Sequence, residues 1–153
     1  MFEKILINLY REELNQSDIE KVKNLVSDFY KVSREVLDKV KISYSNLPTF
    51  YACVIRKIGD YVQVLYKPIA KILGVYNPKT KEVYIDKKIP YNLKVKTLIH
   101  EYVHAIQDYL GKLYTNSKRE LEKEAHKVSD YLFKIYNQAS QKFASFLNYP
   151  TLV

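Results

Sequence analysis

The chain has 153 residues, of which 25 are basic and 17 acidic, so its formal net charge is +8 at pH 7. This length suits one domain with a single core that needs no disulfides. No apolar run approaches the roughly 20 residues of a membrane span, and residues 1–10 lack the pattern of a signal peptide. We expect a soluble, cytoplasmic domain with helices over 1–41, a small sheet over 42–89, two longer helices over 90–147 and a tail over 148–153.

The positive charge permits binding to nucleic acid or to an anionic surface. However, the basic residues are spread along the chain in runs of at most two, and many of the fifteen tyrosines fall at the spacing of a helical core. Both features argue against specific nucleic-acid binding. Abundant Lys, Ile, Tyr and Glu with no Trp are typical of a thermophile. The single cysteine, Cys53, suits a reducing interior, and we expect a small buried hydrophobic residue there.

The N-terminal part has the pattern of helices. Apolar residues over 2–9 form a short amphipathic stretch, which is followed by Ser17-Asp18-Ile19-Glu20, a capping box. Apolar residues then recur every three or four positions as far as Val40, with Ser33 in the one gap. This spacing predicts a longer helix that begins at the capping box and packs against its own domain.

The middle of the chain predicts short strands. Residues 42–44, 50–56 and 61–66 are rich in β-branched and aromatic side chains, and Gly59-Asp60 is a hairpin turn. Residues 74–86 form a second predicted hairpin, with strands around Val75 and around Val83 and Ile85 and a turn at 77–80.

Residues 94–110 have the pattern of a helix with a broad apolar face. Asn92 is placed to cap its N-terminus, and Gly111 is placed to end it. The motif His100-Glu101-Tyr102-Val103-His104 lies inside this helix and is flanked by uncharged residues. Because positions four apart share one helix face, both imidazoles can bind the same metal ion. Glu101 is then placed to take a proton from a water at that metal.

A third protein ligand is expected downstream, because two imidazoles alone seldom hold a catalytic zinc ion. Residues 118–134 form a second amphipathic helix that carries Glu122, Glu124 and His126. Glu122 and His126 lie on one flank of its apolar stripe and Glu124 on the other. Helical geometry alone does not choose among the three.

The motif with its following Ala-Ile-Gln, together with Glu122-Lys123-Glu124-Ala125-His126, resembles the gluzincin metallopeptidases, in which a second helix supplies a glutamate ligand. The short chain is most similar to the minigluzincins, small archaeal proteins of this clan. The resemblance covers about 74–132 and implies an α+β, zincin-like fold. It also implies a Zn²⁺ ion on His100, His104 and Glu122, with Glu101 as the catalytic base. His126 stands where many gluzincins have an aspartate that supports a ligand histidine, so its role and that of Glu124 stay open.

The resemblance implies hydrolysis of peptides or proteins, with the strand before the motif helix forming the rim of the cleft. Two other functions remain open. One is a zincin-fold binding or regulatory module without turnover, and the other is a basic nucleic-acid-associated protein whose zinc site is structural. The apolar tail over 148–153 also suggests a latent enzyme in which the tail covers the cleft. Oligomeric state and cleavage preference do not follow from the sequence.

Overall fold

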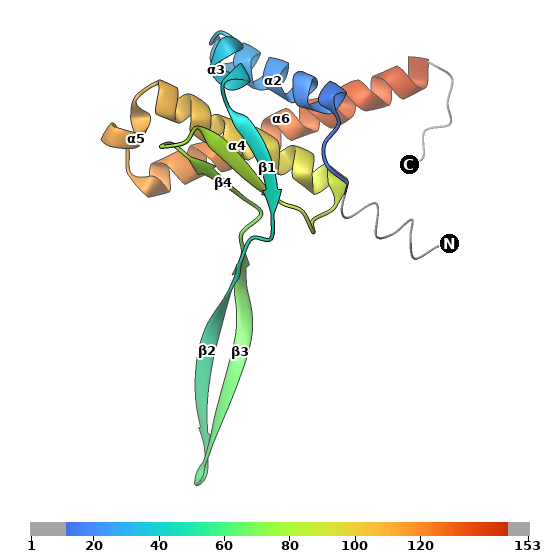
Figure 1. Ribbon diagram of the computed structural model, residues 1–153. Helices are drawn as coiled ribbons and strands as arrows, with labels where there is room; N and C mark the ends of the chain where they lie inside the picture. Colours follow the sequence, from blue (N-terminus) through green and yellow to red (C-terminus); the bar gives the residue numbers. More distant parts are fainter. Residues whose placement is uncertain (1–11, 147–153) are drawn as a thin grey trace.

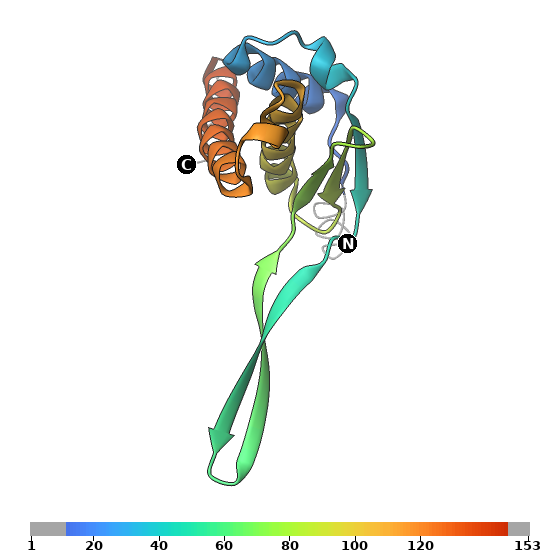
Figure 2. The same cartoon turned by 90° about the vertical axis from the view of Figure 1, so that its left-hand side faces the viewer.

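The computed structural model describes residues 12–146, with side chains described up to 139 apart from six in the middle of the chain. The predicted stretches over 2–9 and 148–153 lie outside the described residues. The fold mixes helices and strands, as expected for an α+β protein. Its body has three layers, in which a small sheet and the long helix α6 (Lys118–Phe146) lie on opposite sides of helix α4 (Tyr91–Tyr109), while α2 (Gln16–Tyr30) covers one end (Figure 1, Figure 2).

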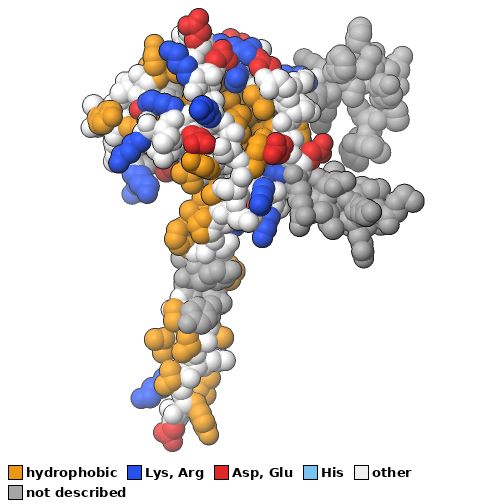
Figure 3. Space-filling model, in the orientation of Figure 1, with side chains coloured by type: hydrophobic (Ala, Val, Ile, Leu, Met, Phe, Trp, Pro, Cys, Tyr) orange, Lys and Arg blue, Asp and Glu red, His pale blue; other side chains and the backbone are white. Residues whose placement is uncertain are grey.

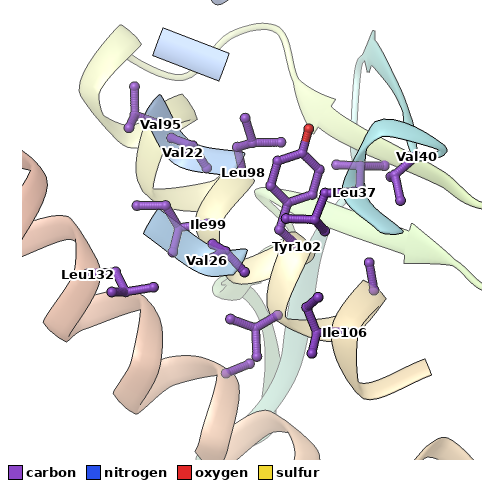
Figure 4. Close-up of a cluster of buried hydrophobic side chains, with 14 of the residues drawn as sticks. Val22, Val26, Leu37, Val40, Val95, Leu98, Ile99, Tyr102, Ile106 and Leu132 are labelled. Atoms are coloured by element: carbon purple, nitrogen blue, oxygen red, sulfur yellow. The ribbon is translucent and has the colours of Figure 1, made fainter. Parts of the chain in front are cut away.

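Helix α4 is the centre of the body. It contacts α2, the short helix α3 (Glu35–Asp38), α6 and the sheet, which explains why apolar residues occur nearly all round it. Side chains from all these elements meet in one core (Figure 4), including Val22, Val26, Leu37, Leu98, Ile99, Tyr102, Ile106 and Leu132.

The sheet of the body has three strands in the order β1-β5-β4. Strand β1 (Lys41–Ser45) runs parallel to β5 (Glu82–Asp86), and β4 (Gly74–Asn77) pairs with β5 in the antiparallel sense. The hairpin predicted over 74–86 is therefore present as β4 and β5. Strand β4 is an edge strand and packs directly on α4.

The remaining two strands correct the expectation of a single small sheet. Among the described residues, strands β2 (Thr49–Ile58) and β3 (Tyr61–Lys71) pair only with each other, and they form a long two-stranded ribbon that projects from the body (Figure 1). The turn at Gly59-Asp60 is where it was predicted. Cys53 lies on this ribbon and is exposed, so the expectation of a buried cysteine was wrong.

The helix boundaries differ from the prediction at three places. Asn15, not Ser17, caps α2, because its Oδ1 accepts a hydrogen bond from the Asp18 backbone at 2.8 Å. The same helix ends at Tyr30, since Lys31 takes a left-handed conformation (φ 53°) that closes the last turn. Helix α4 begins one residue before Asn92, directly after the extended Pro90, so Asn92 is not its cap.

Two helix predictions are confirmed. Gly111 adopts a left-handed conformation (φ 76°) just after α4, as a residue that ends a helix does. The second amphipathic helix begins at Lys118 and runs without a break to Phe146, which agrees with the helices expected over 90–147. Helix α5 (Lys112–Thr115) makes the tight connection between the two.

Candidate metal centre

Three of the predicted site residues come together where α4 and α6 face each other. The Nε2 atoms of His100 and His104 are 3.2 Å apart, and the Glu122 carboxylate lies 3.3 Å from the first and 3.1 Å from the second. Among the described residues, these three form the group of His, Cys, Asp and Glu side chains whose ligand atoms all lie within 4.8 Å of one another. Helix α4 supplies both imidazoles, and α6 supplies the carboxylate across the interface.

The separations within the cluster are of the size that a zinc site requires. Bonds of about 2.0–2.1 Å to a common ion place neighbouring ligand atoms roughly 3.3 Å apart. The two Nε2 atoms are 3.2 Å apart, Glu122 Oε2 is 3.3 Å from His100 Nε2, and Glu122 Oε1 is 3.1 Å from His104 Nε2, all close to that value. The donor set of two imidazole nitrogens and one carboxylate oxygen is also one that zinc uses in catalytic sites.

Gln107 determines the tautomer of His104. Its Nε2 group donates to the Leu121 carbonyl at 3.0 Å and to the Glu124 carboxylate at 3.3 Å, so its Oε1 must face His104. That oxygen lies 2.7 Å from His104 Nδ1, which must carry the proton of the bond. With the proton on Nδ1, the Nε2 atom of His104 is the one that faces His100 and Glu122.

His100 is neutral at physiological pH. Burial lowers the pKa of His100 to about 4, and the neighbouring His104 adds to this shift, while the Glu122 carboxylate partly opposes it. His100 therefore brings an imidazole nitrogen without a proton to the cluster. Such an arrangement favours a bound cation.

Glu101 is buried beside this cluster and is held by strand β4. Its side chain is screened from water, and burial together with the Glu122 carboxylate raises the pKa of Glu101 to about 8, although a backbone hydrogen bond from Tyr76 opposes the shift. A cation bound nearby would favour the ionised carboxylate. The group is therefore positioned to exchange a proton near neutral pH.

The strand lies so close to α4 because Gly74 has no side chain. A Cβ atom at this position would overlap with Thr97 Cγ2 and lie 3.1 Å from Glu101 Cγ. The glycine lets the backbone of β4 pass directly over the motif. The predicted rim strand therefore borders the cluster.

Two cavities meet at Gly74 and Glu101. One of about 280 Å³ opens on the side of His100 and His126, and one of about 480 Å³ opens on the side of His104 and Glu122. Together they provide space on both sides of Glu101, along the edge of β4.

The other two predicted candidates occupy different places. Glu124 faces away from the cluster and accepts hydrogen bonds from Tyr30 at 2.9 Å and from Gln107 and Lys112 at 3.3 Å. His126 lies on the rim. Its ring is 4.7 Å from that of His100, its Nε2 is 3.9 Å from Glu122 Oε2, and its side chain is 71% exposed. Glu122 is thus the acidic residue of α6 that faces both imidazoles.

Sequence reasoning missed Gln107 and Gly74. Gln107 could have been suspected, because it is a polar residue three positions after His104 on the same helix face. The proximity of Gly74 to Glu101 depends on a contact between strand and helix, for which the sequence carries no comparable signal.

Comparison with known proteins identified no relative of this chain. No family model, curated protein or solved structure matches the chain.

Proposed function

We propose that this protein is a zinc-dependent metallopeptidase of the gluzincin type. The observation that supports the proposal best is the convergence of His100, His104 and Glu122 beside a buried Glu101. Two imidazoles and a carboxylate leave one position of a tetrahedral zinc ion free for a water or a substrate. A structural site would use a fourth protein ligand instead. The nearest further histidine, His126, points from the exposed rim, and its Nε2 is 3.9 Å from Glu122 Oε2.

Each residue of the site has a separate role in the proposed reaction. A zinc ion held by His100, His104 and Glu122 would polarise the scissile carbonyl as a Lewis acid and make water more acidic. Glu101 accepts a proton from the attacking water and delivers it to the leaving amine. His126, on the rim of the cavity beside Glu101, is the candidate that stabilises the oxyanion, because the hydroxyl of Tyr76 is already donated to Asp108 at 2.7 Å.

An extended peptide is the substrate that fits this site. The outer edge of β4 has no partner strand in the described part of the chain, and it borders both cavities. A peptide that pairs with this edge would be held by backbone hydrogen bonds on both sides of Glu101. This binding would give affinity with little dependence on side chains.

The experiment that tests this function compares the wild type with Glu101→Gln in a casein or fluorogenic peptide assay, with zinc content measured on the same samples. The amide cannot accept the proton, so we expect cleavage to fall by about 10²-fold or more while zinc is retained. Wild-type cleavage by Glu101→Gln would show that the mechanism is wrong. Zinc without cleavage in the wild type would favour the binding or regulatory module.

A further inference from the structure

The β2–β3 ribbon carries an unusual share of exposed apolar side chains. Seven of the thirteen large hydrophobic residues that are exposed in the described part of the chain lie on it, although it forms only a narrow projection. Figure 3 shows hydrophobic side chains along its length, outside the body. The seven are Phe50, Ile55, Ile58, Tyr61, Val62, Val64 and Leu65.

Both faces of the outer half of the ribbon carry exposed apolar side chains. The register places Ile55 opposite Val64 on one face and Ile58 opposite Tyr61 on the other. These four side chains are between 48% and 80% exposed. A partner that covers one face would leave the other in water, whereas a surrounding layer would cover both.

The ribbon is also cationic. Its outer half carries Arg56 and Lys57 against one acidic side chain, Asp60, and its inner half adds Lys67 and Lys71, of which Lys71 pairs with Asp86 of the body. Lys87 and Lys88 follow β5, and both are exposed. The Lys87 backbone amide donates to the carbonyl of Ser45 at the end of β1, which places this pair close to the base of the ribbon. Two copies of a chain with net charge +8 would bring like charges together if their ribbons associated. The charge therefore favours an anionic partner over a second copy.

We propose that the outer half of the β2–β3 ribbon docks on anionic lipid surfaces. Its apolar side chains enter the boundary between headgroups and acyl chains, as those of an interfacial helix do. Arg56 and Lys57 contact lipid phosphates while their apolar stems stay with the neighbouring side chains, and Tyr61 keeps its hydroxyl at headgroup level. The unpaired backbone edges of a two-stranded ribbon keep it at this depth and out of the hydrocarbon.

Flotation of the full chain with vesicles tests the proposal. We expect binding to mixed phosphatidylcholine–phosphatidylglycerol vesicles, weaker binding in high salt, and little binding to pure phosphatidylcholine. Ile55→Ser/Tyr61→Ser/Val62→Ser should lower binding by about tenfold or more. The matched variant Leu110→Ser/Tyr114→Ser/Tyr131→Ser removes three exposed hydrophobic side chains from the body, and it should bind as the wild type does.

A single tryptophan gives a second measurement, which does not depend on a variant that binds vesicles less well. The chain contains no Trp, so the emission of Tyr61→Trp reports on the ribbon alone. We expect a blue shift with anionic vesicles, and none for Tyr114→Trp. Absence of the shift, or equal binding to neutral vesicles, would overturn the proposal. A dimer that the triple ribbon variant dissociates, without vesicle binding, would overturn it in favour of a second copy.

Discussion

Gln107 shows how one buried amide can orient a histidine of the candidate metal site. It is fully buried, and its two donors are used by the Leu121 carbonyl and by Glu124. Its remaining oxygen accepts the Nδ1 proton of His104 and leaves the Nε2 lone pair directed at the cluster. Hydrogen bonds of this kind hold the orientation of a metal-binding imidazole and raise its affinity for metal.

Replacing Gln107 should weaken metal binding through His104. We expect Gln107→Leu to lower zinc affinity by about 10- to 100-fold, measured by competition with a chromophoric chelator. It should also lower the free energy of unfolding by about 1–3 kcal/mol, because the Leu121 carbonyl loses its donor. Gln107→Glu keeps an acceptor for His104 and should retain more of the affinity. Equal affinities in all three proteins would rule out this role.

At the level of single residues, the sequence predicts much of the candidate site. The spacing of His100 and His104 on one helix requires that they share a face, and this prediction is confirmed. The choice among Glu122, Glu124 and His126 depends on how α6 is rotated against α4. That rotation is set by packing, including the bonds of Glu124 to Tyr30 and Lys112, which no local pattern in the sequence encodes.

At the level of elements, the contact between β4 and α4 positions Glu101. The strand approaches the helix at Gly74, where a side chain would collide with Thr97 and crowd Glu101. The Tyr76 backbone, two residues on, then reaches the Glu101 carboxylate. The rim of the cavities and the orientation of Glu101, the proposed catalytic base, therefore depend on the same contact.

A methyl group at Gly74 should separate the strand from the helix. We expect Gly74→Ala to lower the free energy of unfolding by about 1–3 kcal/mol, as overpacking does, and to reduce peptide cleavage. Thr97→Ser removes the Cγ2 atom but keeps the hydroxyl that donates to the Leu93 carbonyl at 2.7 Å. In denaturant titrations, the double variant should regain part of the lost stability. Additive losses would show that this contact does not limit the approach.

Elements with a strong local signal were predictable, and those set by distant contacts were not. The apolar periods of α4 and α6 and the turn at Gly59-Asp60 were sufficient to place these elements. The end of α2 at Tyr30 was missed, because the left-handed Lys31 interrupts an apolar spacing that continues to Val40. The division of five strands into two sheets was also missed, since strand pairing joins residues far apart in the chain.

At the level of the whole molecule, the body and the ribbon do not share a hydrophobic core. The hydrophobic core is drawn from the helices and the three-stranded sheet, and neither β2 nor β3 contributes a described residue to it. The two strands of the ribbon leave the body side by side, where the Ile72 backbone amide donates a hydrogen bond to the Pro48 carbonyl. The body should therefore keep its structure without the ribbon.

Excision of the ribbon tests this independence. Replacing residues 50–70 with a short Gly-Ser linker should shift the thermal midpoint by only a few degrees, because no core contact is removed. Zinc content should stay as in the wild type, while vesicle binding should be lost. A body that unfolds, or that loses zinc, would show that the ribbon supports the site.

The metal content of the purified protein tests the central claim most directly. Zinc should be measured by elemental analysis for the wild type, His104→Ala, Glu122→Gln and Glu124→Gln, after confirming by circular dichroism that each is folded. The last two variants carry the same change two residues apart on α6, one facing the imidazoles and one facing Tyr30. We predict about one zinc ion per chain in the wild type and in Glu124→Gln, and little in the other two. Zinc in none of the proteins, or its loss in Glu124→Gln but not in Glu122→Gln, would contradict the account.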